Sequence, residues 1–268
     1  MLKIKKKIKF THSENRMKQE GNVKLSINSF DKNQNKNLFA LLRERFNWMN
    51  KFIQKDDKGI EVGAAAGFSK LFINNDNFKI SDYSNYSHLD YKNIDAQNTG
   101  FSDGEFNYVI ASNMIHHLPY PIKFFNEMHR ILKKNGKLII FDAHCSVLLQ
   151  SILILMKHEG FDFTKNVWDE DSPATDEKDL WSGNSAIPYL LFNNNKKFDS
   201  NLGDKFEIKY KKLCECFLFL NSGGVTSKTF HIPLNFFVLK TIKYVDDFLS
   251  FLLPGVFALG YKIVLVKK

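Results

Sequence analysis

The fold is decided by residues 58–67, which read Lys-Gly-Ile-Glu-Val-Gly-Ala-Ala-Ala-Gly. The run Gly59–Val62 is short and apolar, as expected for a buried parallel strand. Small residues follow it, with Gly63, Ala65 and Gly67 at every second position. Such a turn lets the backbone bend sharply and lets a ligand approach it closely. We therefore expect a strand that ends in a ligand-binding turn.

A second strand with an acidic end follows about 20 residues later. Residues 78–82 read Phe-Lys-Ile-Ser-Asp. An acid at this distance from a small-residue turn commonly holds the ribose of a nucleoside through its hydroxyls. Together the two features favour a nucleoside cofactor, although the turn alone equally fits close packing of a helix on a strand.

The segment from Glu61 to Asp142 resembles the class I S-adenosylmethionine-dependent methyltransferases, in particular the type 11 group that includes ubiquinone-type and small-molecule enzymes. Residues 111–118 and 136–141 are similar to the family's fourth and fifth strands. The resemblance implies S-adenosylmethionine as the cofactor. It also implies cofactor contacts from Glu61, Gly63, Ala65 and Gly67 in the first motif, Asp82 at the ribose, Asp95 and Ala96 at the adenine, and Ser112 after the fourth strand. Ala65 departs from the more common glycine but still leaves room.

The expected fold is α/β, a doubly wound, mostly parallel seven-stranded sheet of the Rossmann-like methyltransferase type with an antiparallel edge and an inserted substrate-binding segment. Hydrophobic periodicity predicts further elements around it. They are helices over 37–52, 68–73, from Pro121 to a stop at 135–136 and over 236–253, and strands over 106–112, 206–220 and 261–266.

The domain organisation follows from where these patterns begin and end. Residues 1–36 are expected to be a basic, polar lead-in, and residues 37–268 a single methyltransferase domain. Within it, residues 144–203 form the expected substrate-binding insertion, because tryptophan, proline, aspartate and asparagine occur there without a clean period.

Composition limits the location and the partners. The chain has 268 residues, of which 44% are hydrophobic, enough for one domain with a sizeable core. The net charge of +9 is concentrated in lysines near both ends, which favours a solvated tail over a nucleic-acid-binding arm. Three cysteines without a Cys-x-x-Cys spacing fit a reducing cytoplasm. No signal peptide or membrane-spanning segment is expected, although peripheral membrane contact stays open.

Methyl transfer to a hydroxyl requires alignment and a base. Four histidines lie near the expected carboxyl edge of the sheet. His116 and His117 are expected to shape the turn after the fourth strand. His144 follows the fifth strand, and His158 has a neighbouring acid in Glu159. We therefore predict His144 and His158 as the candidate bases.

The acceptor is predicted from the insertion. Part of it resembles a bacterial methyltransferase subgroup associated with surface polysaccharides, which implies a sugar or glycoconjugate precursor. Candidate substrate contacts are Trp168, Trp181 and Tyr189 for stacking, and Asp162 and Asn184 for hydroxyls. The aromatic residues equally fit anchoring of the insertion on the sheet.

Three other functions stay open: methylation of a lipid or quinone precursor, suggested by the apolar segments 147–156 and 236–253, methylation of nucleic acid, and a non-catalytic scaffold. The scaffold is disfavoured because both cofactor carboxylates are kept. No metal site is expected, because no helical spacing brings His158, Glu159 and Asp162 together.

Overall fold

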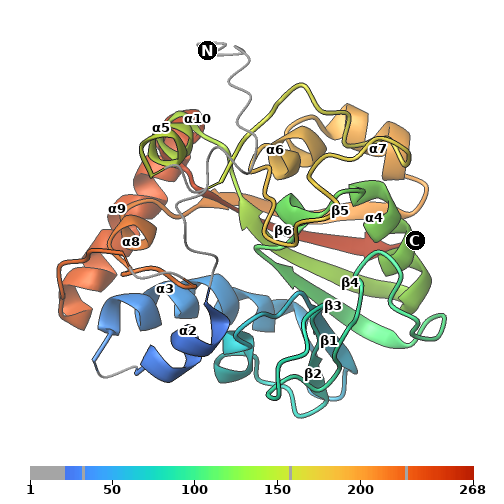
Figure 1. Ribbon diagram of the computed structural model, residues 1–268, viewed down its shortest axis with the longest axis horizontal. Coiled ribbons are helices and arrows are strands. Elements are labelled where there is room, and N and C mark those ends of the chain that lie inside the picture. Colours follow the sequence, from blue (N-terminus) through green and yellow to red (C-terminus); the bar gives the residue numbers. More distant parts are fainter. Residues whose placement is uncertain (1–21, 32–33, 157–158, 227–228) are drawn as a thin grey trace.

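The protein is described by a computed structural model that covers residues 22–31, 34–156, 159–226 and 229–268. Within these ranges it forms one six-stranded sheet in the order β2-β1-β3-β4-β6-β5 (Figure 1). The strands are β1 Gly59–Val62, β2 Phe78–Ile80, β3 Phe106–Ser112, β4 Leu132–Ala143, β5 Phe206–Cys214 and β6 Gly260–Lys267.

Strand pairing gives the sheet a parallel part and an antiparallel part. β1 pairs in parallel with β2 and β3, and β3 pairs in parallel with β4. β6 runs antiparallel between β4 and β5. Every residue of β1 is buried, as expected for a central strand with both faces covered. The predicted Rossmann-like methyltransferase fold is therefore confirmed.

Helices cover both faces of the sheet. The α-helices are α2 Val23–Ser29, α3 Lys36–Phe46, α4 Pro121–Ile131, α5 Val147–Met156, α6 Ile187–Phe192, α7 Asn195–Leu202, α8 Phe217–Leu220, α9 Phe236–Leu252 and α10 Pro254–Phe257. Short 3-10 helices are η1 Asn47–Phe52, η2 Phe68–Leu71 and η3 Ile115–His117.

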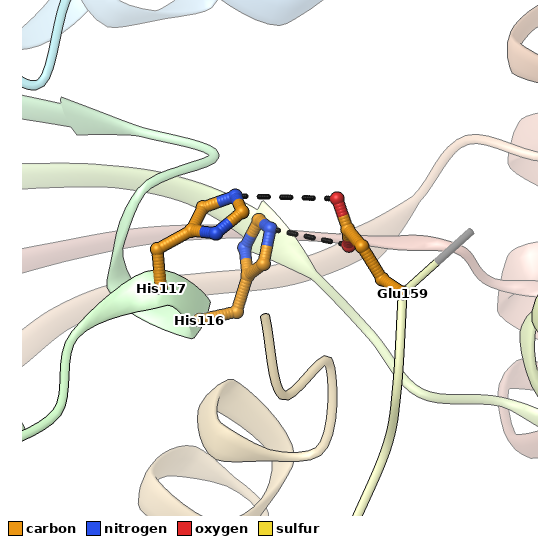
Figure 2. Close-up of side chains that lie close together, drawn as sticks. All are labelled: His116, His117 and Glu159. Carbon is orange, nitrogen blue, oxygen red and sulfur yellow. Dashed lines mark ion pairs between the residues drawn. The ribbon is translucent and has the colours of Figure 1, made fainter. Parts of the chain in front are cut away.

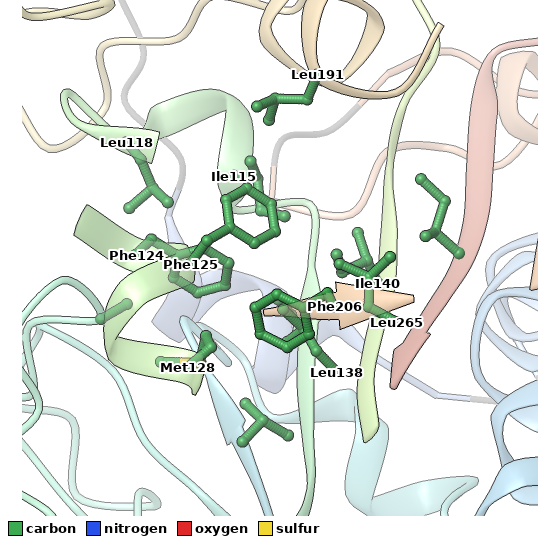
Figure 3. Close-up of a cluster of buried hydrophobic side chains, with 14 of the residues drawn as sticks. Ile115, Leu118, Phe124, Phe125, Met128, Leu138, Ile140, Leu191, Phe206 and Leu265 are labelled. Atoms are coloured by element: carbon green, nitrogen blue, oxygen red, sulfur yellow. The ribbon is translucent and has the colours of Figure 1, made fainter. Parts of the chain in front are cut away.

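Each face of the sheet has its own apolar core. On one face α4, α6 and α7 pack against the strands, with Phe124, Phe125 and Leu191 fully buried (Figure 3). On the other face α2, α3, α8 and α9 contribute to a second cluster that includes Leu41 and Met49. The sheet is thereby held between two helical layers, and its carboxyl edge is left to form a site.

The strand count differs from the prediction, because the described part contains six strands instead of seven. Beyond β2 the chain forms only isolated bridges, between Ser81 and Tyr91 and between Asp95 and Asn98. Residues 82–98 are rich in serine, asparagine and aspartate, which favour turns over strands.

The end of β5 also differs from the predicted strand over 206–220. β5 stops at Cys214, because Glu215 adopts a left-handed backbone with φ of 67° and α8 follows. The apolar residues 217–220 therefore form the helix α8 and do not continue the strand. A short apolar run cannot be assigned to either element from its pattern alone.

The predicted lead-in is partly a packed element. Residues 1–21, which include the basic end, lie outside the described residues. Residues 22–31 contain α2, and the Asn22 side chain caps it by accepting the Leu25 N–H at 2.8 Å. Val23 is buried in the second core cluster. The lead-in thus belongs in part to the domain.

Segment 144–203, the predicted substrate-binding insertion, also contributes to the hydrophobic core. Phe192, Phe198 and Leu202 from α6 and α7 are fully buried in the first core cluster. The irregular stretch between α5 and α6 lies at the carboxyl edge of the sheet, where Gly160 forms a bridge with Asn184. Only part of the predicted insertion is therefore available for a ligand.

None of the helices in the described ranges combines the length and the apolar composition that crossing a membrane requires.

Asp246 fixes α9 against α8 through backbone hydrogen bonds. Its buried carboxylate accepts the N–H groups of Cys216, Phe217 and Leu218 at 3.0, 2.9 and 3.0 Å. These donors belong to the first turn of α8, which has no other side-chain cap. One carboxylate therefore decides which face of α9 is turned inward.

We expect Asp246→Ala to lower the free energy of unfolding by about 1–3 kcal/mol, because it leaves buried N–H groups without an acceptor. Urea unfolding followed by circular dichroism measures the change. The matched control is Asp247→Ala, which removes only surface ion pairs with Lys212 and Lys243 and should cost less than about 1 kcal/mol. Equal losses in both variants would contradict the capping role.

Candidate active site

A cavity of about 910 Å³ opens where the parallel strands end. Its walls include the turn after β1, Asp82 after β2, Ser112 at the end of β3 and Ala143 at the end of β4. Ligands of open α/β sheets bind at this edge. The volume lies near the upper end of the range of about 300–1,000 Å³ for small-molecule sites. The cavity is therefore the candidate active site.

The turn after β1 has a left-handed backbone at three positions. Gly63, Ala65 and Gly67 have φ of 70°, 46° and 68°. A Cβ atom on Gly63 would lie 2.9 Å from Met114 Cβ, and one on Gly67 would lie 2.7 Å from Ile80 Cδ1. The glycines are thus required by backbone conformation and by neighbouring side chains, in addition to any ligand. Gly63 and Ala65 line the cavity, whereas Gly67 does not.

Asp82 faces this turn, as predicted. Its Oδ2 atom accepts the Ala65 N–H at 2.8 Å, and its Oδ1 atom accepts the Ser84 N–H at 2.8 Å. His88, which the sequence analysis did not identify, bonds the Ala65 carbonyl oxygen through Nε2 at 2.7 Å. Asp82 and His88 therefore fix both the N–H and the carbonyl group of Ala65 in the turn. Asp82 also lines the cavity, where its remaining lone pairs can accept hydroxyl protons.

Glu61 is a buried acid at the bottom of the cavity. Its side chain accepts a hydrogen bond from the Ser69 hydroxyl, and among the described residues no cation lies within ion-pair distance of it. Burial therefore raises the pKa of Glu61 to about 8. A buried carboxylate of this kind gains most from a ligand that brings a positive charge, such as an amino acid ammonium group.

The remaining predicted cofactor residues lie along the same wall. Asp95, Ala96 and Ser112 line the cavity. The Asp95 Oδ1 atom accepts the Gln97 N–H at 2.8 Å, which holds the carboxylate in a local turn. Seven of the eight predicted cofactor residues thus line one cavity. Gly67 does not line it and packs against Ile80 and His88.

His116, His117 and Glu159 also line the cavity and lie close together (Figure 2). His116 is buried, with Nδ1 2.5 Å from Asp142 Oδ1 and Nε2 3.4 Å from Glu159 Oε2. Burial alone would lower its pKa, but the two carboxylates outweigh this and raise the pKa of His116 to about 10. His116 is therefore an imidazolium at neutral pH.

His117 lies beside it in the opposite protonation state. Its Nδ1 atom is 2.9 Å from the Ser182 carbonyl oxygen, which can only accept, so Nδ1 carries the proton. Its Nε2 atom lies 4.0 Å from Glu159 Oε1. Burial lowers the pKa of His117 to about 4, and the charge of His116, whose ring centroid is 4.1 Å away, contributes in the same direction. His117 thus presents an unprotonated Nε2 atom as a proton acceptor.

The same three side chains are a candidate metal-ligand group. One ligating atom each from His116, His117 and Glu159 lies within 4.8 Å of the others. The Nδ1 atoms of the two histidines are held by Asp142 and by the Ser182 carbonyl, as is usual for metal-binding imidazoles. This group differs from the set of His158, Glu159 and Asp162 that the sequence analysis considered and rejected.

Of the two predicted bases, only His144 is among the described residues, and it does not line the cavity. His144 is buried against Tyr261 and Tyr189, with ring centroids 4.7 and 5.8 Å away, and it does not line the cavity. Burial lowers its pKa to about 4. Phe141 and Ala143 line the cavity, and side chains alternate along the chain here, so Asp142 and His144 lie on the other side. His158 lies outside the described residues.

The predicted substrate residues are divided between the cavity and the scaffold. Trp181 lines the cavity. Asp162, Trp168, Asn184 and Tyr189 are not among the residues that line it.

Each of these four has a local structural contact. Asp162 accepts the Thr164 N–H and hydroxyl, and Asn184 accepts the N–H of Asp162 at 2.8 Å. Trp168 packs against the first core cluster, and Tyr189 packs against His144. The anchoring interpretation, which concerned the three aromatic residues, therefore fits Trp168 and Tyr189.

Sequence analysis missed Asp142 and Glu159 as partners of His116 and His117. The signal was present, because an acid that ends one strand and a histidine pair that follows its parallel neighbour must meet at the same edge of the sheet. Glu159 gave no such signal, since its position depends on how the irregular chain after α5 returns to the site.

The raised pKa of Glu61 predicts how stability depends on pH. The unfolded chain releases this proton near pH 4.5 and the folded chain near pH 8, so the folded state loses stability as pH rises through this window. We expect Glu61→Gln to be more stable than the wild type at pH 8 by about 1–3 kcal/mol, with little difference at pH 4.5. Urea unfolding across this range measures it, with Glu207→Gln on the exposed side of β5 as the control. A constant difference between wild type and Glu61→Gln would contradict the assignment.

Comparison with known proteins gives one family match. Residues 68–140 match the family model described as a methyltransferase domain. No curated protein matches the sequence.

Solved structures of low sequence identity also resemble the chain. The MccD protein is 14% identical with a TM-score of 0.47, over 82% of this chain and 95% of that one. A SAM-dependent methyltransferase from Methanosarcina mazei is 15% identical with a TM-score of 0.42, over 83% and 97%. The trans-methyltransferase CalH, in complex with SAH, is 14% identical with a TM-score of 0.46, over 84% and 55%.

The matched domain contains β2 and β3 and ends within β4, and so spans most of the parallel part of the sheet. The residues around the cavity fit an adenosyl amino acid, because a buried carboxylate without a cation and a carboxylate held at the turn lie on one wall. Residues 68–140 are therefore a methyltransferase domain of the class I S-adenosylmethionine-dependent type, and S-adenosylmethionine is the cofactor of the chain.

Proposed function

We propose that this methyltransferase transfers the methyl group to a hydroxyl of a small, sugar-like acceptor, with His117 as the general base. The observation that carries the proposal is the unprotonated Nε2 atom of His117, which is fixed in the same cavity as the cofactor residues. A hydroxyl needs such a base, because it must lose a proton as it attacks a methyl group.

Glu61 and Asp82 bind two different parts of the cofactor in this proposal. The Glu61 carboxylate receives the ammonium group of the amino acid moiety, and Asp82 accepts hydrogen bonds from the ribose hydroxyls. Asp95 and Ala96 border the adenine. Bound S-adenosylmethionine supplies a methyl group on a positively charged sulfur atom. The protein's remaining task is to align the acceptor with that methyl group and to exclude water.

His116 acts as a positioning residue for His117. Its imidazolium is held between Asp142 and Glu159, so its ring and its charge have a fixed place. That charge disfavours protonation of His117, and the Ser182 carbonyl fixes which nitrogen of His117 carries the proton. The arrangement keeps the base ready at neutral pH.

The acceptor end of the cavity favours a hydroxylated molecule. Trp181 provides an aromatic face there, and its edge is turned towards His117, with ring centroids 6.5 Å apart. Asp176 and Asp179 line the same region. An aromatic face beside carboxylates is suited to a sugar ring, whose C–H face stacks while its hydroxyls donate. We therefore assign acceptor binding to the part of segment 144–203 that lines the cavity.

We expect His117→Gln to lower kcat by about 10²–10⁴-fold, because it removes the base, and to leave the affinity for S-adenosylmethionine unchanged. Release of S-adenosylhomocysteine with a panel of sugars and glycoconjugate precursors measures the first quantity, and isothermal titration measures the second. His129→Gln, on α4 and away from the cavity, is the matched control.

Two results would contradict this assignment. One is full activity of His117→Gln with an acceptor that the wild type methylates. The other is loss of wild-type activity on chelation and its recovery on metal addition, which would give His116, His117 and Glu159 a metal-binding role instead.

A further inference from the structure

The outward face of α9 is a ridge of aromatic side chains. Phe237, Tyr244, Phe248 and Phe251 are 79%, 60%, 61% and 83% exposed. Their spacing of seven, four and three residues places them on one side of the helix. The other side carries Leu239, Asp246 and Ser250, which are buried. α9 is thus fixed to the domain by one face and presents an apolar face to the surroundings.

This apolar face continues onto two neighbouring helices. α10 follows α9 directly and contacts both α9 and α5, and the three helices lie along one outer side of the molecule (Figure 1). Leu252, Leu253 and Val256 are exposed at the α9–α10 junction, and Leu155 of α5 is 85% exposed. An exposed apolar surface of this extent marks an interaction site.

The charges of these helices are basic on the outside. α5 and α10 contain no charged residue, and α9 contains Lys240, Lys243, Asp246 and Asp247. Asp246 is buried, and Asp247 is paired with Lys243 and Lys212. Lys240 is exposed beside the aromatic ridge. Aromatic residues flanked by lysine, with no unpaired acid, are complementary to the interface of a bilayer that contains anionic lipid.

The same surface reaches the active-site cavity. Leu149, Ile152, Leu153 and Met156 of α5 line the cavity, while Leu155 of the same helix points outward. Phe230 lines the cavity and is also 87% exposed, so it stands at the mouth. The cavity is therefore apolar along α5, and this helix also belongs to the exposed apolar face.

We propose that α5, α9 and α10 lie on a lipid bilayer and that the acceptor is a membrane amphiphile. Its hydroxylated head enters the cavity to reach His117, and its hydrocarbon chain lies along α5 and leaves through the mouth beside Phe230. The docking half stands on the exposed face alone. The acceptor half rests on the proposed function. A second copy of the chain on this face would cover the mouth, which makes it the less suitable occupant.

Flotation of the full chain with vesicles tests the docking half. We expect the wild type to float with phosphatidylcholine vesicles that contain phosphatidylglycerol. The affinity of the double variant Phe248→Ser/Phe251→Ser for these vesicles should be lower by a factor of about ten or more, because two aromatic side chains no longer enter the interface. Lys240→Glu should weaken binding to these vesicles but not to phosphatidylcholine alone. Leu71→Ser, which is 57% exposed on η2, is the matched control and should float like the wild type.

Three outcomes would overturn the docking half. The wild type does not float, the double variant floats like the wild type, or the wild type sediments as a dimer that the double substitution dissociates while neither form binds vesicles. The five lysines within the first ten residues stay in every variant, so undiminished flotation of the double variant would assign binding to that tail. Unchanged affinity for S-adenosylmethionine shows that the variants are folded.

The acceptor half is tested with one sugar in two forms, as a glycolipid in the vesicles and free in solution. We expect S-adenosylhomocysteine release to be faster with the vesicle-bound form, and this preference to be lost in the double variant. Equal rates with both forms would overturn the acceptor half. Failure to bind S-adenosylmethionine at all would instead defeat the proposed function, whereas flotation would still decide the docking half.

Discussion

The site depends on the buried carboxylate of Asp142. It lies near the end of β4 and accepts the Ile115 N–H at 2.8 Å from the turn after β3, as well as the Ala143 N–H at 2.7 Å. Its third contact is the imidazolium of His116. One side chain therefore joins two neighbouring strands at their ends, and the charge that it stabilises on His116 helps to keep His117 unprotonated.

The cofactor side of the cavity is built on the opposite principle. Asp142 has a cation beside it, whereas Glu61 is buried with no cation within ion-pair distance among the described residues. A buried carboxyl group without a cation destabilises the folded state once it is ionised. The protein can tolerate this because a bound cofactor would bring the missing positive charge. The acid at Glu61 is therefore better explained by ligand binding than by stability.

The sequence allowed the parallel part of the fold and the contact of Asp82 with the turn after β1 to be predicted, because both follow from local patterns. A buried strand, a small-residue turn and a following acid occur within about 20 residues and can be recognised together as one motif. Asp82 therefore faces Ala65 as expected.

The acceptor side could not be predicted in the same way. The position of Glu159 and the burial of His144 depend on how distant segments pack, and a histidine beyond a strand end can turn to either side. His116 and His117 were expected to shape the turn, as in the family they resemble, and their acidic partners lie 26 and more residues further along the chain. Similarly, Trp168 and Tyr189 are residue types that often bind sugars, but here Trp168 packs on the first core cluster and Tyr189 packs against His144.

The apolar segments 147–156 and 236–253 show why composition alone left two interpretations open. α5 is apolar on two faces, one in the cavity and another outside. α9 keeps its few polar anchors, such as Asp246 and Ser250, on the buried side. A helix that serves only the core would have the reverse arrangement, with apolar residues inside and polar residues outside. Burial among the described residues therefore does not account for the aromatic ridge, which fits the proposed docking on a bilayer.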